Sequence, residues 1–328
     1  MRIVITGAAG FLGRALIERL ASAGAVDVEG EPRQIHEILA CDVVEAPLAS
    51  LAATYPLVRP LLGRVGDPDV LGAIVTAQPD LVVHLAAVVS SAAEEDFGLG
   101  LSVNVEATMA LIQALEVLQT PPVFVFASSV AVFACENNEV IQDTTPPTPR
   151  SSYGAQKLIG EVLVRDASRR GILHGRSARV PTISVRPGKP NRAASSFASG
   201  IIREPMTGQD AVLPVGRDVR LHLASPDRAI DNFLHAMALR QEVLEGETTI
   251  TLPGLSVSVG EMLETLRNEA GEGIAARVHS KPDAGVEAIV KSWPGGIETP
   301  RAEALGFQRD GSFRDLLEQF RQTLSTPA

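Results

Sequence analysis

The fold follows from one segment near the start of the chain, Arg2-Ile3-Val4-Ile5-Thr6-Gly7-Ala8-Ala9-Gly10-Phe11-Leu12-Gly13. Its first part is apolar and rich in β-branched residues, which is typical of a strand buried on both faces of a parallel sheet. Three glycines spaced G-x-x-G-x-x-G come next, and an apolar helical pattern then runs through Leu16, Ile17 and Leu20 to Ala23. The segment therefore predicts a strand, a glycine loop and a helix.

The glycine loop predicts a dinucleotide site. Glycines permit a tight turn and a close backbone approach, and the helix N-terminus offers free N–H groups to a pyrophosphate. The alternative is a purely structural turn, because a glycine triplet alone is a weak signal. We expect cofactor contacts from Gly7, Gly10, Phe11, Leu12 and Gly13.

A second predicted strand, 38–41, ends at Asp42. A carboxylate at that position can bond the hydroxyls of the adenosine ribose and would repel a 2′-phosphate. The glycine loop and the residues just after Asp42 contain no arginine. The sequence therefore favours NAD over NADP, the alternative being that Asp42 is an ordinary turn residue.

Strand and helix patterns alternate over the first half of the chain. We expect strands at 58–62, 81–87 and 123–127, helices at 69–77 and 100–118, and a polar loop at 24–32. This alternation predicts an α/β fold with a Rossmann-type doubly wound parallel sheet. We expect a Rossmann domain from residues 1–180, with a returning segment at about 212–245. Residues 181–211 and 246–328 would form a smaller subdomain that caps the substrate.

Tyr153 and Lys157 lie four residues apart in a predicted helix that runs to about Arg170. Both therefore point off one face of that helix. A phenol titrates near ~10, and a fixed ammonium beside it favours the phenolate. A tyrosine tuned in this way can take a proton from an alcohol. The alternative is a surface tyrosine beside a solvated lysine.

Taken together, the motifs resemble the extended short-chain dehydrogenase/reductase family. They are the glycine loop, Asp42, His84-Leu85-Ala86-Ala87, Asn104, Ser128-Ser129 and Tyr153-x-x-x-Lys157, in that family's order and spacing. The resemblance implies a Ser–Tyr–Lys catalytic set and a nicotinamide cofactor. Ser129 matches the catalytic hydroxyl, Lys157 would also contact the nicotinamide ribose, and Asn104 would help to relay the proton. His84 we interpret as a packing residue.

The resemblance also implies cofactor contacts beyond the glycine loop. The small residues at the end of the predicted strand 81–87 would let a flat cofactor lie close to the backbone. The remaining expected contacts are Val65, Leu85, Ala86, Ala87, Asn104, Ser128, Tyr153, Lys157 and Pro181.

Some positions depart from the pattern of family members that act on nucleotide sugars. Val132-Phe133-Ala134 stands in place of V-Y-G, and Thr182 replaces the asparagine that would face a nucleotide diphosphate. Arg64 takes the place of the usual acidic residue in the adenine loop. These departures argue against a nucleotide-sugar substrate while they leave the cofactor motifs largely intact.

Late segments offer cations that could hold the carboxylate of a small sugar acid. We expect Arg186 to do so, then Arg220 or Lys189, and we note Arg192 and His222 as further candidates. Ser90, in the loop after Ala87, together with Ser129 and Tyr153, would complete the substrate site. The resemblance implies NAD-dependent oxidation of a secondary alcohol in a sugar acid of about four carbons.

Composition narrows the remaining possibilities. The formal net charge of −10, with no basic run, argues against nucleic acid and against an anionic membrane surface. Two cysteines suit a reducing compartment, no spacing resembles a metal site, and the N-terminus lacks a signal-like apolar run. We therefore expect a cytoplasmic protein with a small-molecule substrate.

The sequence leaves two alternative functions open, and it also suggests an oligomeric state. One rival is a nucleotide-sugar epimerase or dehydratase that keeps its NAD tightly bound. The other is a non-catalytic NAD-binding regulator, although such proteins commonly lose the tyrosine or the lysine. The family resemblance implies a homodimer in which helices 100–118 and 151–170 of two chains pack together, as C2 symmetry allows.

Overall fold

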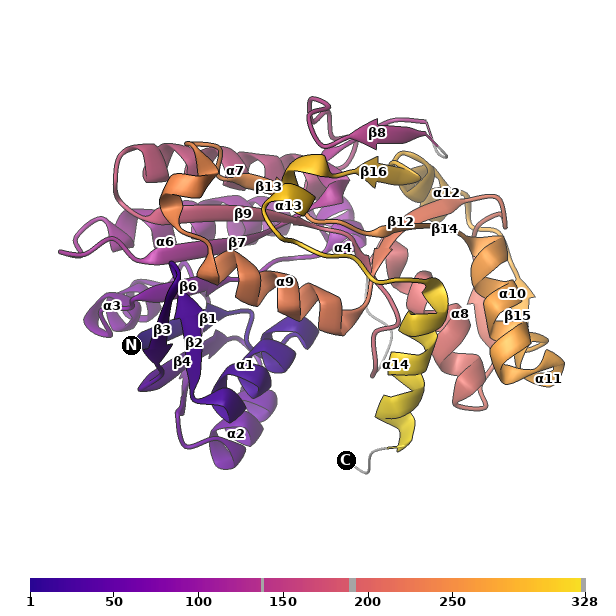
Figure 1. Cartoon of the computed structure of the whole chain (residues 1–328), viewed down its shortest axis with the longest axis horizontal. Coiled ribbons are helices and arrows are strands. Elements are labelled where there is room, and N and C mark those ends of the chain that lie inside the picture. Colours follow the sequence, from indigo (N-terminus) through magenta and orange to yellow (C-terminus); the bar gives the residue numbers. More distant parts are fainter. Residues whose placement is uncertain (137–138, 189–192, 326–328) are drawn as a thin grey trace.

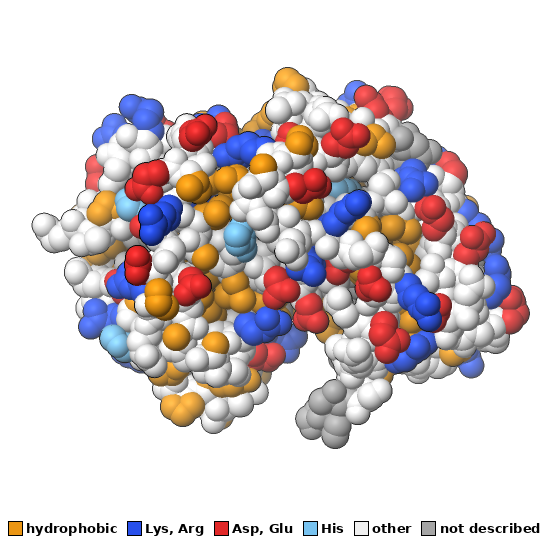
Figure 2. Space-filling view, viewed as in Figure 1, with side chains coloured by type: hydrophobic (Ala, Val, Ile, Leu, Met, Phe, Trp, Pro, Cys, Tyr) orange, Lys and Arg blue, Asp and Glu red, His pale blue; other side chains and the backbone are white. Residues whose placement is uncertain are grey.

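The computed structural model describes residues 1–136, 139–188 and 193–325 of the 328-residue chain. A larger α/β unit that carries the N-terminus lies beside a smaller unit that carries the C-terminal helix (Figure 1). Acidic and basic side chains are intermixed over the face of the molecule shown in Figure 2. On that face the excess negative charge is therefore spread over the surface rather than gathered in one region.

The larger unit is built on a seven-stranded sheet of order β13-β9-β7-β6-β1-β4-β5 in the described part of the chain. Every pair of neighbours in it is parallel. The order reverses between β1 and β6, and ligands of such sheets bind at that switch point, beyond the carboxyl ends of the strands. The strands are β1 (Arg2–Thr6), β4 (Glu37–Asp42), β5 (Val58–Leu62), β6 (Leu81–His84), β7 (Val123–Ser129), β9 (His174–Val180) and β13 (Thr249–Thr251).

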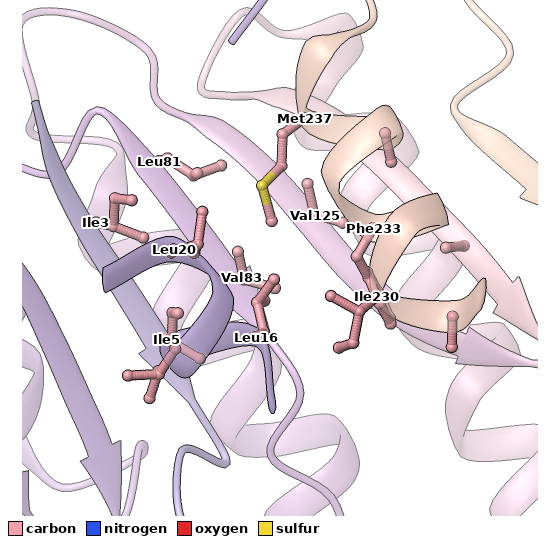
Figure 3. Packing of buried hydrophobic residues seen from close by; sticks show 14 of the residues in the cluster. Ile3, Ile5, Leu16, Leu20, Leu81, Val83, Val125, Ile230, Phe233 and Met237 are labelled. Carbon is pink, nitrogen blue, oxygen red and sulfur yellow. The ribbon is translucent and has the colours of Figure 1, made fainter. Parts of the chain in front are cut away.

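Helices cover both faces of this sheet because its central strands are apolar on both sides. Ile3 and Ile5 pack under α1 (Phe11–Ala23), α2 (Glu45–Thr54) and α9 (Pro226–Ala238). Figure 3 shows this cluster, with Leu16 and Leu20 facing the strands and Phe233 entering from α9. Val4 points the other way, as alternation requires. That opposite face is covered by α3 (Pro68–Thr76), α6 (Ala107–Leu115) and α7 (Ser152–Arg169).

One continuous helix, 97–115, contains a π-helical turn. It consists of α5 (Phe97–Leu101), η1 (Ser102–Glu106) and α6, and the short α4 (Ser90–Glu95) precedes it. By length and composition alone, Phe97–Leu115 is a candidate membrane span with a mean hydropathy of 1.3. Leu111 and Leu115 pack beneath the sheet, as in the core helix of a globular fold.

The smaller unit has its own apolar core. Its sheet has the order β10-β12-β14, formed by β10 (Thr182–Ile183), β12 (Arg220–Ala224) and β14 (Leu255–Ser258). Side chains from α8 (Phe197–Met206), α10 (Val259–Ala270) and α14 (Phe313–Ser325) pack around it. The remaining strand pairs are β2 (Ala25–Val28) with β3 (Glu31–Gln34), β8 (Val140–Gln142) with β16 (Gly296–Glu298), and β11 (Ala211–Leu213) with β15 (Val278–Ser280). The remaining short helices are α11 (Glu272–Ala275), α12 (Ala284–Lys291), α13 (Pro300–Ala304), η2 (Val130–Val132), η3 (Ala194–Ser196) and η4 (Gln241–Leu244).

The predicted α/β fold with a doubly wound parallel sheet is confirmed. Segment 24–32, expected as a loop, forms most of the β2–β3 hairpin, in which Glu29 and Gly30 have the positive φ of a tight turn. The returning segment differs in detail from the expected 212–245. Helix α9 covers the large sheet as expected, but β13 also joins that sheet, while β11 and β12 pair with strands of the smaller unit.

Candidate active site

A cavity of about 870 Å³ lies beyond the carboxyl ends of β1, β4, β6 and β7. The wall of this cavity has two parts. The glycine-loop part includes Gly7, Gly13, Asp42, Val65 and Ala86, whereas the arginine part includes Ser90, Thr182, Arg186, Ser195 and Trp293. Ser129, Tyr153 and Lys157 line the same cavity. The fold thus brings the expected catalytic trio into one space with both parts.

The glycine loop is a cradle that side chains would fill. Gly7 has φ +69°, and a Cβ there would lie 2.7 Å from the backbone nitrogen of Ala86. A Cβ on Gly13 would collide with the carbonyl oxygen of Gly7. Helix α1 begins after Gly10 without a side-chain cap, so the N–H groups of its first turn are left for a ligand. This geometry fits the pyrophosphate of a dinucleotide.

Asp42 joins the end of β4 to the glycine loop. Its Oδ2 accepts a hydrogen bond from Ala9 N at 3.0 Å, and its Oδ1 accepts from Val43 N and Val44 N. The carboxylate is therefore held at the cavity wall, where its remaining lone pairs can accept from ribose hydroxyls. Val65 is buried in the same wall, and Phe11, Leu12, Leu85, Ala87 and Pro181 also line it.

Local sequence places Tyr153 against Ser129. Ser151 caps helix α7, since its side chain accepts from Gly154 N at 3.2 Å. A Cβ on Gly154 would collide with the carbonyl oxygen of Ala131, so glycine lets α7 approach the segment that follows β7. Ser129 ends β7, and its hydroxyl acts to lower the pKa of Tyr153. Lys157 Nζ lies 4.8 Å from the ring centre of Phe126 and 5.7 Å from that of Tyr153.

Burial dominates the protonation of this pair. Burial raises the pKa of Tyr153 to about 12, against the opposing effects of the Ser129 hydrogen bond and the Arg186 charge. Burial also lowers the pKa of Lys157 to about 7, against the attraction of Glu161. Lys157 was expected to lower the pKa of Tyr153. The pKa is raised instead, because removing the phenolate from water outweighs the nearby charges.

A buried ionic network supports the trio. Ser128 Oγ donates to Glu161 Oε1 at 2.5 Å, and Arg179 donates to both oxygens of Glu161 at 2.9 and 2.7 Å. The Arg179 guanidinium also lies 4.7 Å from the ring centre of Phe133. Sequence analysis missed Glu161, although its place four residues after Lys157 on the same helix was a usable signal.

Asn104 does not take the expected place beside the reacting groups. It is buried in the π-helical turn and does not line the cavity. Its Oδ1 accepts from Val88 N at 2.8 Å, and its Nδ2 donates to Val88 O and to Gln156 Oε1. The side chain thus fixes the loop after β6, and its help in relaying the proton stays a prediction.

Arg186 is the expected cation that the structure brings to the cavity. Its backbone N donates to Ser199 Oγ at 3.0 Å, and its carbonyl accepts from Arg203. Within the described residues, its buried Nη2 has no hydrogen-bond partner. Ser90 lies nearby in the wall, where its Oγ accepts from Ala194 N and its proton can still be donated.

Arg220 and His222, two further candidate cations, do not line the cavity. Arg220 donates to Ser256 and pairs with Glu261 at 3.3 Å on β12, so its expected role as a substrate residue is corrected. Burial lowers the pKa of His222 to about 4, which keeps that side chain neutral. Lys189 and Arg192 lie outside the described residues. His84 is buried between Thr6 and Thr108, as a packing residue should be.

With this geometry established, the class of protein can be stated. Residues 3–247 match the model of the NAD dependent epimerase/dehydratase family, and the chain belongs to that family. It is an NAD-dependent oxidoreductase, which confirms the resemblance to extended short-chain dehydrogenases and the NAD prediction.

Two relatives are similar over nearly the whole chain. D-erythronate dehydrogenase of Cupriavidus necator is 45% identical over 322 residues, which cover 98% of each chain. D-erythronate dehydrogenase of Haemophilus influenzae is 41% identical over 320 residues, again 98% of each. The similarity therefore includes both units of the fold.

A solved structure described as the nucleoside-diphosphate-sugar epimerase from Agrobacterium tumefaciens is also similar. Its TM-score is 0.91 at 37% identity, covering 100% of this chain and 95% of that one. L-threonine 3-dehydrogenase from Trypanosoma brucei has a TM-score of 0.86 at 21% identity and covers 98% and 96%. At that lower identity the likeness shows the fold.

Proposed function

We propose that this protein oxidises D-erythronate to 2-oxo-D-erythronate with NAD, using Ser129, Tyr153 and Lys157. The observation that carries the proposal is the unpartnered, buried Nη2 of Arg186, a residue that lines the cavity together with Tyr153. A buried guanidinium with a free donor suits a carboxylate. The relatives named D-erythronate dehydrogenase, alike over 98% of the chain, support D-erythronate as the source of that carboxylate.

In the proposed mechanism, the substrate hydroxyl lies against Ser129 and Tyr153, which line the same cavity. Tyr153, as phenolate, removes the hydroxyl proton while Ser129 holds the oxygen. Lys157 stabilises the phenolate, and Glu161 supports the charge of Lys157. The glycine loop, Asp42 and Lys157 would hold NAD, which supplies a hydride acceptor and a positive charge near the phenol.

The rival substrate class is a nucleotide sugar, because a structurally similar chain is described as a nucleoside-diphosphate-sugar epimerase. Thr182 lines the cavity at the position where an asparagine would face a diphosphate. Its single hydroxyl is a poorer donor set for a diphosphate than an amide with two N–H groups. This position supports the sugar acid over the nucleotide sugar.

The test is a panel of four-carbon sugar acids and UDP-sugars with NAD and NADP, followed by absorbance of the reduced cofactor. We expect net NADH formation with D-erythronate and none with a UDP-sugar. A UDP-sugar that raises the melting temperature while no sugar acid is oxidised would replace this proposal with the epimerase.

We also propose a homodimer built on helix 97–115 and α7. Large apolar side chains are exposed on both, including Phe97 (61%), Met109 (41%), Ile159 (42%) and Val162 (55%). The inner faces of these helices pack on the sheet. A second copy of the same pair would cover the outer faces, as an isologous interface does.

A further inference from the structure

The side chain of Trp293 has a donor without an acceptor. Trp293 is the only tryptophan of the chain, and it lies in the wall of the cavity that holds Tyr153 and Arg186. The side chain is 8% exposed. Within the described residues, its buried Nε1 has no hydrogen-bond partner. An indole nitrogen can only donate, so a ligand oxygen is the acceptor that this position lacks.

The backbone around Trp293 is fixed from both sides. Ser292 O accepts from Cys135 N at 3.0 Å, and Trp293 N donates to Val290 O at 3.1 Å. Gly295 is held by Glu139 through its N–H and by Ser256 through its carbonyl. The segment is therefore anchored both to the chain before α7 and to β14.

The indole ring is fixed by packing as well. It belongs to the same apolar cluster as Ala131 and Ala194, and Tyr153 packs against that cluster. A ring held in this way cannot turn its N–H toward water without disturbing the core. The unpartnered donor is thus a fixed feature of the wall, in the same cluster as the reacting tyrosine.

We propose that Trp293 contacts the substrate and that its indole N–H donates to a hydroxyl oxygen of the sugar acid; this assignment rests on the function proposed above. Arg186 and Trp293 both line the cavity, and each has a buried donor without a partner among the described residues, Nη2 of Arg186 and Nε1 of Trp293. The charged guanidinium takes the carboxylate, because charge-assisted bonds are the stronger ones. The neutral N–H is left for a neutral oxygen beyond the reacting carbon.

This assignment makes Trp293 a specificity-determining residue. A site with a fixed, buried donor binds a substrate that offers the matching oxygen and rejects an analogue that lacks it, because the donor is then left unpaired. The enzyme should therefore prefer D-erythronate to 2-hydroxybutanoate. The analogue to use is the enantiomer of this four-carbon acid that shares the C2 configuration of D-erythronate, because it lacks the hydroxyls at C3 and C4.

The experiment combines the two substrates with wild type and Trp293→Phe. We expect kcat/KM for D-erythronate to fall about tenfold to a hundredfold in the variant, as loss of one buried hydrogen bond predicts. The kcat/KM for 2-hydroxybutanoate should fall much less. The ratio of kcat/KM for D-erythronate to kcat/KM for 2-hydroxybutanoate should therefore fall at least ~10-fold in the variant. A ratio that stays constant would show Trp293 to be a packing residue and overturn the inference.

A second measurement uses tryptophan fluorescence in NAD-loaded Tyr153→Phe, which forms little NADH that would quench the emission. Since Trp293 is the only tryptophan, the signal reports on this one position. We expect D-erythronate to change the emission in a saturable way, and an unchanged emission at saturation would contradict the contact. If wild type does not oxidise D-erythronate, the proposed function fails together with the inference. If it does and the ratio is constant, the inference alone fails.

Discussion

The glycine-loop part and the arginine part of the cavity use the chain in different ways. In the glycine-loop part, much of the chemistry belongs to the backbone of one short segment, Gly7 to Gly13. The arginine part collects single side chains from distant positions, including Ser90, Arg186 and Trp293. A backbone cradle suits a ligand common to many proteins, whereas dispersed side chains can change one by one to suit a particular substrate.

Tyr153→Phe should give the largest effect, and it should separate chemistry from cofactor binding. The ring and its packing remain, but the proton acceptor is lost, so we expect kcat to fall at least ~10²-fold. The dissociation constant for NAD should hardly change. Tyr55→Phe, at the end of α2 and outside the cavity wall, is the matched control. Turnover close to wild type in Tyr153→Phe would refute the mechanism.

Arg186→Gln should damage the arginine part alone. Loss of a charge-assisted bond to the carboxylate should raise KM for D-erythronate about tenfold to a hundredfold. KM for NAD should stay within about twofold, because the glycine-loop part is untouched. Arg220→Gln is the control, since that guanidinium pairs with Glu261 away from the cavity. An equal rise in KM in both variants would argue against Arg186 as the carboxylate ligand.

The pH profile tests the coupling of Tyr153 and Lys157. The pKa of Tyr153 is about 12 and that of Lys157 is about 7. The fraction of enzyme in the active form, with a Tyr153 phenolate and a Lys157 ammonium, therefore rises about tenfold per pH unit below pH 7 and then levels off. We expect kcat/KM for D-erythronate to follow this curve. Glu161→Gln removes the group that raises the pKa of Lys157, so the plateau should begin at lower pH. A break that does not move would show that Glu161 has no electrostatic role.

Asp42→Ala should change the glycine-loop part alone. Wild type should prefer NAD strongly, because the carboxylate accepts from ribose hydroxyls and repels a 2′-phosphate. In the variant, the ratio of kcat/KM with NAD to kcat/KM with NADP should fall roughly tenfold, which corresponds to about 1.4 kcal/mol. The KM for D-erythronate should be unchanged. Equal use of both cofactors by wild type would remove this role from Asp42.

The homodimer should have the smallest effect on the reaction itself. Light scattering should give a dimer mass, and Val162→Glu, on the exposed face of α7, should shift it toward the monomer. Ser102 and Ala107 of helix 97–115 line the cavity on one side of the predicted interface. The variant should therefore weaken NAD binding more than D-erythronate binding. A wild-type monomer mass at every concentration would contradict the proposal.

The sequence by itself determined the doubly wound sheet and the glycine loop, because both depend on local patterns. Buried strands of the Ile3–Ile5 type, glycines at a fixed spacing and an i, i+4 pair on one helix are each visible within a few residues. The family resemblance, and not these local patterns, implied that Ser129 would share a site with Tyr153 and Lys157, and all three line one cavity.

Only the tertiary structure decided which polar side chains reach the cavity. Arg186 and Arg220 are equivalent as sequence signals, but their surroundings differ. The buried Nη2 of Arg186 has no partner among the described residues, whereas Arg220 bonds to Ser256 and pairs with Glu261. Asn104 is likewise consumed by the loop after β6. Trp293 enters the wall because Cys135 and Ser256 anchor its segment from far along the chain. Hydrogen bonds between distant segments produce no local pattern in the sequence, so the residues of the arginine part could be identified only in the folded structure.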